Sequence, residues 1–393
     1  MLWARLIPAV LACAVAVLVC PSAGQAAQNV EVLIQPGLDS QLGSRFTRYL
    51  DDLVNDGWNP NVYAVPTGTT PEQLRTYLRS RYETAGTVGA VVVEATQWAT
   101  PLPYAKYDDT SPPNDRAPVD LFYMDLDGQW DDPDNDGYYE HHSNGSGTQT
   151  PEIWLGRMTV DTVSRLESYL DRNHTYRYWP TGSKAERPAL GYVTHDWSPG
   201  TTARTAIGQA FTVPTWVTYP DATAAGWKAD IQDSYAFAFV ATHSSHWTHW
   251  FDSGTVSVTD IPGIDSRTRF FYLWACHAAD FGGHDRYLAG EYVFGTEAGL
   301  GSLGSANSGG LWPRDFYFEK LNEGYTLGEA YFLWTFDEAN PDGSFTDDWL
   351  GWHWGMSTIG DPTLTVVLIP EPATLALLAL GGLALALGRR PRG

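Results

Sequence analysis

The chain has 393 residues, and its 46 aspartates and glutamates outnumber its 24 lysines and arginines, which gives a net charge of −22 at pH 7. This excess of acid argues against a nucleic acid or an anionic lipid surface as a partner. The 17 tryptophans and 21 tyrosines argue against disorder, because acidic disordered chains are poor in aromatic residues. The composition therefore favours a folded extracellular domain with a sizeable core.

The first 27 residues are predicted to be a secretory signal peptide. Arg5 supplies a positive start, and residues 7–19 form an apolar run that is too short to span a bilayer. Small residues up to Ala27 then offer a cleavage site. We therefore expect residues 1–27 to be absent from the mature protein.

Strands and helices are predicted to alternate between residues 28 and 180. Apolar runs predict strands at 30–34, 61–65, 88–93 and 153–155, and helices are predicted at 40–57, from Pro71 onward and at 160–179. Thr70 is a favourable N-cap for the second of these helices, and proline suits a first helical position. The stretch 100–150 is predicted to be rich in loops. The strand–helix order implies a parallel sheet with helices on both faces.

A second strand–helix series begins after residues 181–184. Strands are predicted at 189–194, 235–241 and 270–275, and a helix at 202–211. The sequence therefore predicts an α/β fold made of two tandem subdomains, residues 28–180 and 181–368. Each subdomain is expected to hold a mainly parallel sheet flanked by helices.

Cys276 is the only cysteine outside the leader, since Cys13 and Cys20 fall within it. Exported proteins normally pair their cysteines, so a lone thiol favours a chemical role. A small buried side chain is the alternative, because free cysteine is often buried.

The ends of two predicted strands bring this thiol close to a histidine. Cys276 follows the strand at 270–275, and His243 follows the strand at 235–241. Functional groups gather at the carboxyl ends of parallel strands, so we expect both residues on adjacent loops at one sheet edge. A histidine placed there can stabilise a thiolate and protonate a departing amine.

Five segments, taken in order along the chain, resemble those of one peptidase family. They are Pro151–Arg157, Thr242–Ser245 with Trp247, Ala275–Cys276 with Asp280–Phe281, Leu321–Ala330 and Gly360–Leu364. Over most of residues 28–368 the chain thereby resembles the gingipain family of caspase-like cysteine peptidases.

The resemblance implies a caspase-like fold, protein or peptide substrates, and peptide-bond hydrolysis without a cofactor. It implies that Cys276 attacks the scissile carbonyl and that His243 protonates the leaving amine. The backbone N–H groups of Cys276 and Ser244 would form the oxyanion hole. Ser244 replaces the family's usual glycine, whose backbone angles serine does not readily adopt. Asp196 stands where the family carries the carboxylate that orients the histidine, although a turn-forming aspartate is the alternative.

Two functions from different classes remain open at this stage. The first is an exported cysteine endopeptidase. The second is a non-catalytic envelope or matrix binding protein on the same scaffold, which the serine at position 244 favours. Relatives that cleave after arginine carry an acid in the loop after the Asp196 strand, and residues 198–211 contain none. Specificity for a basic P1 residue is therefore not carried over from the family.

Further histidines crowd the same region, namely His246, His249, His277 and His284. They make a zinc site an alternative use of this region. Neither an HExxH nor a CxxC spacing occurs, so the sequence pattern gives zinc little support.

An acidic segment in the loop-rich stretch of the first subdomain predicts a calcium site. Oxygen-bearing residues recur at alternate positions, and Gly137 turns the chain between them; the predicted ligands are Asp132, Asp134, Asp136, Tyr138 and Glu140. Ser143 stands where an EF-hand has its bidentate glutamate, so the loop is not a full EF-hand. Asp125 and Asp127 were the candidates to complete the shell, and a solvated acidic turn is the alternative.

The C-terminal residues 369–393 resemble a PEP-CTERM sorting signal. Pro370-Glu371-Pro372 precedes an uncharged stretch from Ala373 to Gly388, and an arginine cluster follows. This order predicts export, a transient transmembrane anchor with the arginines in the cytoplasm, and cleavage by an exosortase partner. An ordinary tail anchor without cleavage is the alternative.

Overall fold

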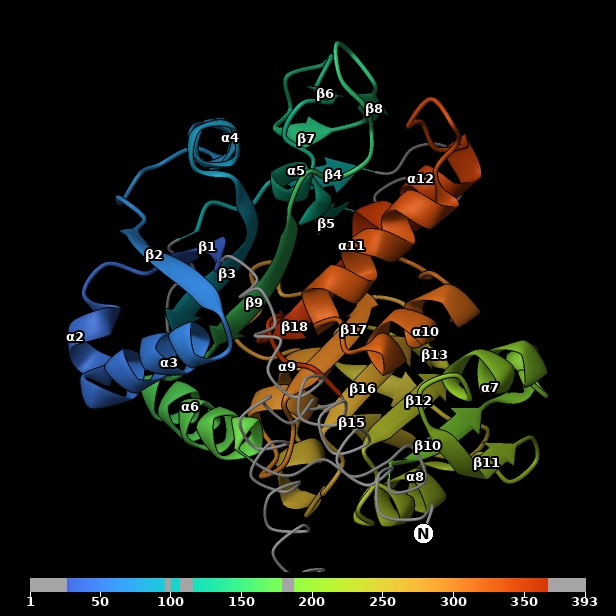
Figure 1. Cartoon of the computed structure of the whole chain (residues 1–393). Helices are drawn as coiled ribbons and strands as arrows, with labels where there is room; N and C mark the ends of the chain where they lie inside the picture. The colour runs from blue at the N-terminus through green and yellow to red at the C-terminus, as the bar shows by residue number, and fades with distance from the viewer. Residues whose placement is uncertain (1–26, 96–99, 107–115, 179–186, 367–393) are drawn as a thin grey trace, which may run out of the picture.

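The computed structural model describes residues 27–95, 100–106, 116–178 and 187–366 (Figure 1). Its centre is a ten-stranded sheet with the order β11-β10-β12-β16-β17-β18-β9-β3-β1-β2. The strands are β1 (Gln28–Ile34), β2 (Trp58–Ala64), β3 (Thr87–Ala95), β9 (Trp154–Val160), β10 (Pro188–Val193), β11 (Thr212–Thr218), β12 (Phe237–Ala241), β16 (Phe270–Trp274), β17 (Gly301–Ser305) and β18 (Met356–Gly360).

The sheet consists of two sets of five parallel strands that run in opposite directions. Every neighbouring pair is parallel except β17 and β18, which are antiparallel. The first set contains β18, β9, β3, β1 and β2, and the second contains β11, β10, β12, β16 and β17. The carboxyl ends of the two sets therefore lie at opposite edges of the sheet.

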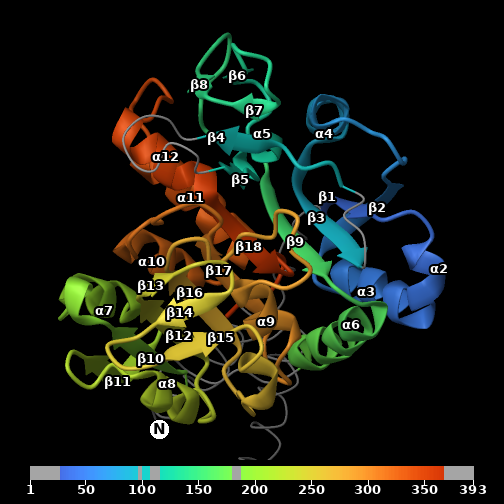
Figure 2. The same ribbon diagram turned by 180° about the vertical axis from the view of Figure 1, so that it is seen from behind.

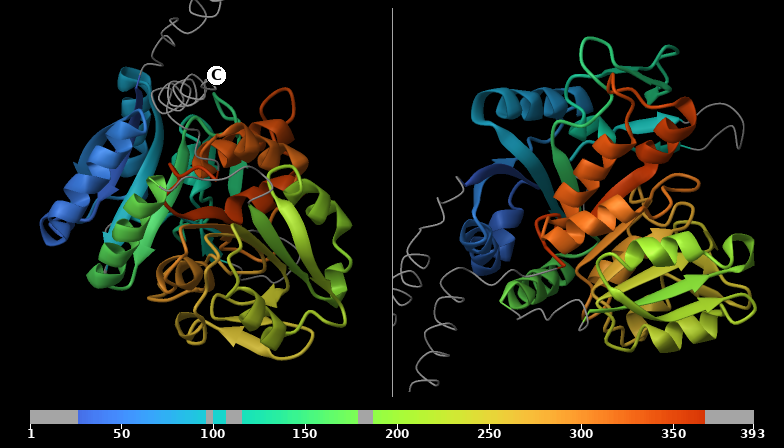
Figure 3. Two further views of the ribbon diagram at one scale, coloured as in Figure 1. Left: turned by 60° about the horizontal axis from the view of Figure 1, so that its bottom comes forward. Right: turned by 45° about the vertical axis from the view of Figure 1, so that its right-hand side comes forward.

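Helices cover both faces of the sheet, and each face has its own apolar core. One core includes α3 (Ser44–Asn55), α6 (Val163–Arg177), α8 (Ala224–Asp230) and α9 (Leu288–Phe294). The other includes α4 (Pro71–Ala85), α5 (Leu121–Met124), α7 (Thr201–Ile207), α10 (Asp315–Glu323) and α11 (Leu327–Glu338). Along β3, Val91 and Val93 face the first core and Ala90 and Val92 the second, as the two-residue period of a strand requires. Figure 3 shows strands β10, β11 and β12 of the second set, in yellow-green, with helices on both sides.

The remaining elements are short. They are α2 (Leu38–Leu42), α12 (Asp347–Gly355), the 3₁₀ turns η2 (His195–Trp197) and η3 (Ile261–Gly263), and three small sheets: β4 (Tyr104–Lys106), β5 (Arg116–Pro118) with β7 (Tyr138–Tyr139); β6 (Gln129–Asp131) with β8 (His141–Ser143); and β13 (His243–Ser244), β14 (Thr248–Trp250) with β15 (Thr255–Ser257). The last of these continues directly from β12 and is seen in Figure 2.

The two strand sets meet where β9 lies beside β18. Gly156 on β9 has no room for a side chain, because a Cβ there would lie 2.7 Å from Pro362. Asp361, which follows β18, accepts hydrogen bonds from Asn173 (2.9 Å) and Arg177 (2.6 Å) on α6. The Pro151–Arg157 and Gly360–Leu364 segments are thus a structural junction between the halves.

Most predicted elements are present, and the differences concern how the sheets join. Thr70 caps α4 as predicted, since its Oγ1 accepts the Gln73 N–H and the Gln73 side chain accepts the Thr70 N–H. The fold is α/β with a mainly parallel sheet flanked by helices, as expected. The sequence indicated one sheet in each half, whereas β17, β18 and β9 join both into a single sheet. Among the described residues, no helix is long and apolar enough to cross a membrane, and the predicted segment 373–388 lies outside those residues.

Candidate active site

Three adjacent strands of the second set place the predicted catalytic residues at one sheet edge. In the register of the sheet, Val193 on β10 pairs with Ala241 on β12, and Ala241 pairs with Trp274 on β16. His243 and Cys276 each lie two residues beyond these paired positions, and Asp196 lies three beyond. The structure therefore brings together the three residues that sequence reasoning selected.

His243 is held by a carboxylate on the neighbouring loop. Its Nε2 lies 2.9 Å from Oδ2 of Asp196. The His243 and Asp196 side chains remain 59% and 40% exposed, so both can be reached from solvent. Because Nε2 faces the carboxylate, the hydrogen bond selects the tautomer with the proton on Nε2 and leaves Nδ1 for other partners.

A second histidine and a second aspartate, which sequence reasoning missed, extend this chain of contacts. Nε2 of His195 lies 2.9 Å from Oδ1 of Asp196. The backbone N–H of His195 donates to Oδ1 of Asp252 at 3.0 Å, and its Nδ1 lies 3.3 Å from the same atom. Asp196 thus lies between two imidazoles, so its position is fixed from both sides. Its neighbour His195 was visible in the sequence, but Asp252 is distant along the chain and gave no signal.

The Cys276 thiol is partly buried and close to backbone donors. The Gly309 N–H donates to its Sγ at 3.2 Å. Only glycine fits position 309, because its φ is +82° and a Cβ there would lie 1.6 Å from the Trp352 ring. The N–H of Cys276 itself donates to no acceptor among the described residues.

Ser244 and His277 fix the backbone on either side of the thiol. The Ser244 hydroxyl donates to the Cys276 carbonyl. Ser244 does not have a positive φ, because the only described non-glycine residues with positive φ are Asn135 and His277. The expected conflict between serine and a glycine conformation is therefore absent here. His277, with φ +56°, is anchored through Nδ1 to Ala306 O at 3.0 Å and through Nε2 to Ser308 Oγ at 3.2 Å.

Tryptophans surround the histidine, and sequence reasoning did not assign them to the site. The Trp197 ring meets the His243 ring edge-on with centroids 4.6 Å apart, and it meets Trp274 at 4.9 Å. Trp250, which pairs with His243 across the β13–β14 hairpin, is 46% exposed. No hydrogen bond joins His243 to the Cys276 sulfur among the residues the structure describes.

The acidic loop gathers four of the predicted calcium ligands. Carboxylate oxygens of Asp132, Asp134, Asp136 and Glu140 lie within 4.8 Å of one another. The Glu140 side chain is 9% exposed, and neither of its oxygens has a hydrogen-bond partner in the described structure. Burial, together with the three aspartates, raises the pKa of Glu140. Asp132 and Glu140 are partly buried, whereas Asp134 and Asp136 are exposed. Lys106 lies 3.5 Å from Glu140 and 4.0 Å from Asp134, and Arg116 lies 3.3 Å from Asp136. Clustered carboxylate oxygens are the donors that a hard cation such as calcium takes.

The residues expected to complete the calcium shell do not do so, and one histidine of the zinc alternative lies in the core. Asp125 and Asp127 group with Glu152 rather than with the acidic loop. Asp125 is fully buried and contacts His142. His249 is fully buried against Phe251 and Tyr292, and burial lowers its pKa to about 3. It therefore belongs to the core and does not join the other histidines.

The chain belongs to peptidase family C25, the gingipain family of cysteine peptidases, whose model matches residues 52–367. Solved structures show that the fold is similar to that of known proteases. One, "Structure of Protease", is 14% identical with a TM-score of 0.63, covering 86% of this chain and 78% of that one. An Arg-specific cysteine proteinase, gingipain R (RgpB), is 15% identical with a TM-score of 0.62, covering 88% and 79%. A complex of the Porphyromonas gingivalis RgpB pro- and mature domains is 14% identical with a TM-score of 0.61, covering 86% and 79%. No curated protein gave a significant match.

Proposed function

We propose that this chain is an exported cysteine endopeptidase that uses Cys276 as nucleophile, His243 as general acid and Asp196 as the group that orients His243. The observation that carries the proposal is the convergence of these side chains at three adjacent strand ends, in a member of a cysteine peptidase family. Membership in that family implies that peptide-bond hydrolysis needs no cofactor.

The reaction divides into two steps. The Cys276 thiolate attacks the scissile carbonyl carbon, and the N–H groups of Cys276 and Ser244 stabilise the resulting oxyanion. His243 gives a proton to the amine as the C–N bond breaks, which leaves a thioester on Cys276. His243 then takes a proton from water as the water oxygen attacks the thioester carbonyl, the C–S bond breaks, and the carboxylic acid product leaves a Cys276 thiolate beside a protonated His243. The free amide N–H of Cys276 supports its place in the oxyanion hole.

The surface beside the dyad favours apolar over basic substrate side chains. Trp247 and Trp250 are 44% and 46% exposed on the hairpin that follows His243. Exposed aromatic rings contribute large apolar contact areas. Residues 198–211 contain no acid that could pair with an arginine side chain, so the arginine specificity of gingipain R is not transferred to this chain.

Cleavage of a broad peptide library by the mature chain tests the proposal. Cys276→Ala is expected to abolish cleavage and to lower the free energy of unfolding by only about 1–2 kcal/mol, because the cavity left by one sulfur is small. Equal cleavage by both proteins would reject Cys276 as nucleophile. A folded wild-type chain that cleaves nothing would instead favour the non-catalytic envelope or matrix binding protein.

We also propose that the acidic loop binds calcium through Asp132, Asp134, Asp136 and Glu140, with the carbonyl of Tyr138 as a further ligand. The loop is already folded around its carboxylates, since Asp132 accepts the Gly137 N–H at 2.9 Å. EDTA is expected to lower the melting temperature, and CaCl₂ to restore it, because an ion bound only to the native state stabilises it. Glu140→Gln should remove most of this response. A melting curve that EDTA leaves unchanged would contradict the site.

The third proposal concerns sorting and rests on the sequence of residues 369–393 alone. The chain is exported, held briefly in the inner membrane by residues 373–388, and released near Pro370 by an exosortase into the envelope or matrix. Mass spectrometry of the mature protein should find no peptide beyond Pro372. Recovery of an intact C-terminus ending at Gly393, in a host that encodes an exosortase, would leave only a simple anchor.

A further inference from the structure

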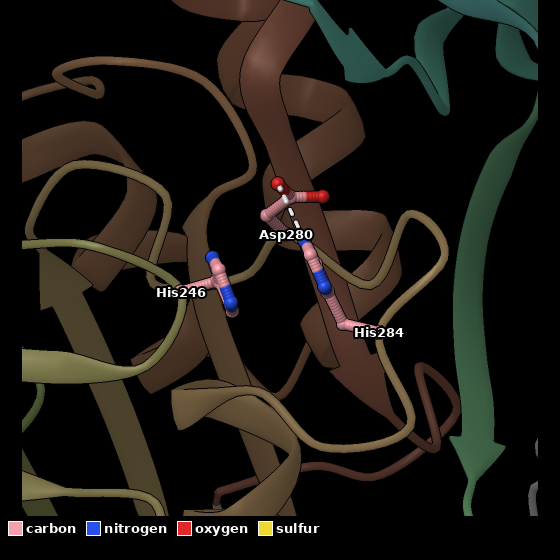
Figure 4. A group of neighbouring side chains, drawn as sticks. All are labelled: His246, Asp280 and His284. Atoms are coloured by element: carbon pink, nitrogen blue, oxygen red, sulfur yellow. Dashed lines mark ion pairs between the residues drawn. The ribbon is translucent and has the colours of Figure 1, made fainter.

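Three metal-binding side chains meet beside the strand ends that carry the proposed dyad. His246 lies between β13 and β14, Asp280 follows β16, and His284 precedes α9 (Figure 4). One ligand atom from each lies within 4.8 Å of the others. Two imidazole nitrogens and one carboxylate oxygen are donors that zinc and similar divalent transition ions take in proteins.

Backbone hydrogen bonds hold the three segments in place. The His246 carbonyl accepts the Leu288 N–H at 2.9 Å, which ties the hairpin to the start of α9. The Ala278 carbonyl accepts the Ala289 N–H at 2.8 Å, which ties the segment after Cys276 to the same helix. The ligands therefore come from loops whose relative positions are fixed by main-chain contacts, as a pre-arranged site requires.

The side chains are close enough to converge on one ion once one imidazole has turned. The His246 and His284 rings are stacked, with centroids 3.7 Å apart and planes 6° apart, and Nε2 of His284 lies 3.6 Å from Oδ2 of Asp280. The nitrogen lone pairs of two stacked rings lie in parallel planes and do not point at one ion. One imidazole must therefore turn about χ2, a torsion angle that histidine varies over a broad range. In a tetrahedral zinc site, metal–ligand bonds of about 2.0–2.1 Å place neighbouring donor atoms roughly 3.4 Å apart. The three donor atoms here, within 4.8 Å of one another, must therefore move somewhat closer together to bind an ion.

We propose that His246, Asp280 and His284 bind a divalent transition ion of the zinc class, with water in the remaining positions. The ion joins the hairpin after His243 to the segment after Cys276, and so stabilises the edge that holds the dyad. It takes no part in breaking the peptide bond. The site stands independently of the proposed peptidase activity, because neither Cys276 nor His243 is a ligand.

Zinc binding to the Cys276→Ala protein tests the site without interference from the thiol. The protein is dialysed against ZnCl₂ in a buffer with millimolar CaCl₂, so that calcium occupies the acidic loop and zinc does not bind there. Bound zinc is then measured by plasma mass spectrometry. We expect about one zinc per chain and a higher melting temperature with zinc, because the ion binds the native state. Co²⁺ should give visible absorption bands from nitrogen and oxygen ligands.

Matched variants identify the ligands. His246→Ala, His284→Ala and Asp280→Asn should each weaken zinc binding by at least tenfold. His174→Ala should not, because His174 pairs with a carboxylate of Asp52 at 2.9 Å outside this cluster. Melting temperatures without zinc close to that of the parent show that the variants fold. Unchanged zinc binding in the His246→Ala/His284→Ala double variant, or no zinc binding by the folded parent, would overturn the proposal.

Discussion

The two strand sets of the sheet use the same packing but put their charged groups in different places. In the first set, Arg157 on β9 is fully buried between Asp120, at 2.6 Å, and Glu94, at 3.6 Å. In the second set, Asp196 and His243 lie at the carboxyl edge and remain reachable from solvent. The buried charges of the first set contribute to the packed interior, whereas the polar groups of the second set can contact a bound molecule.

Within this one sheet, the buried charges that stabilise the fold and the exposed groups proposed for catalysis lie in different strand sets. The Arg157 guanidinium also lies over the Phe281 ring, 4.5 Å from its centroid, so the interior of the first set supports the segment that follows Cys276. The strand ends of the second set are then free to carry partly exposed side chains. Substitutions in the first set should therefore change stability most, and substitutions at the edge of the second set should change activity most.

Arg157→Ala is expected to have the largest effect. It leaves the Asp120 and Glu94 carboxylates buried without their counter-charge, and breaking a buried pair in this way costs about 3–5 kcal/mol. Urea denaturation followed by circular dichroism measures the change. The matched control is Arg79→Ala, whose exposed pair with Glu83 should contribute less than about 0.5 kcal/mol. Similar losses for both variants would contradict the contrast between interior and surface charge.

Asp196→Asn should affect activity and leave stability almost unchanged. The amide keeps the size of the side chain but weakens the hold on the His243 tautomer, so kcat/KM should fall by roughly 10- to 100-fold. The free energy of unfolding should change by less than about 1 kcal/mol, because the pair is partly exposed. Full activity in the variant would contradict an orienting role for Asp196 and favour the alternative, a turn-forming aspartate.

Glu152→Gln should have a smaller effect, visible in the pH dependence of stability. Burial, with Asp125 and Asp127 nearby, raises the pKa of Glu152 from 4.5 to about 8. The folded chain therefore keeps a proton that the unfolded chain loses, and this contribution to stability disappears as the pH rises from 4.5 to about 8. In EDTA at pH 8 the variant should be more stable than the wild type by roughly 1–3 kcal/mol, with little difference at pH 4. Glu83→Gln, on the surface, is the control and should show no such trend.

Local sequence patterns predicted the strands and helices that form around strong apolar runs. The runs at 88–93 and 270–275 are buried on both faces, which is why they read clearly as strands. The strand at 301–305 is Gly-Ser-Leu-Gly-Ser and β18 is Met-Ser-Thr-Ile-Gly, so neither carries a continuous apolar run. Their burial comes from neighbours distant in sequence, and the joining of both halves into one sheet could not be read from them.

The same limit applies to the site. Cys276 and His243 could be selected because each follows a predicted strand, and Asp196 because it stands where the resembling family carries its orienting carboxylate. Asp252 and Gly309 contact the site only through tertiary packing, and their own segments gave no sign of it. In the sequence His249 falls in one region with His246, whereas the alternation of the β14 strand turns His249 into the core.

Labelling of the thiol by a peptidyl acyloxymethyl ketone tests the central claim most directly. Such a reagent reacts with a cysteine nucleophile after binding as a substrate, and tandem mass spectrometry locates the adduct. We predict labelling of the folded wild-type chain at Cys276, competition by peptide substrate, and labelling at least tenfold slower in His243→Ala. Labelling of His243→Ala at the wild-type rate, or a folded wild-type chain whose Cys276 does not react, would contradict a dyad in which His243 assists the Cys276 thiol.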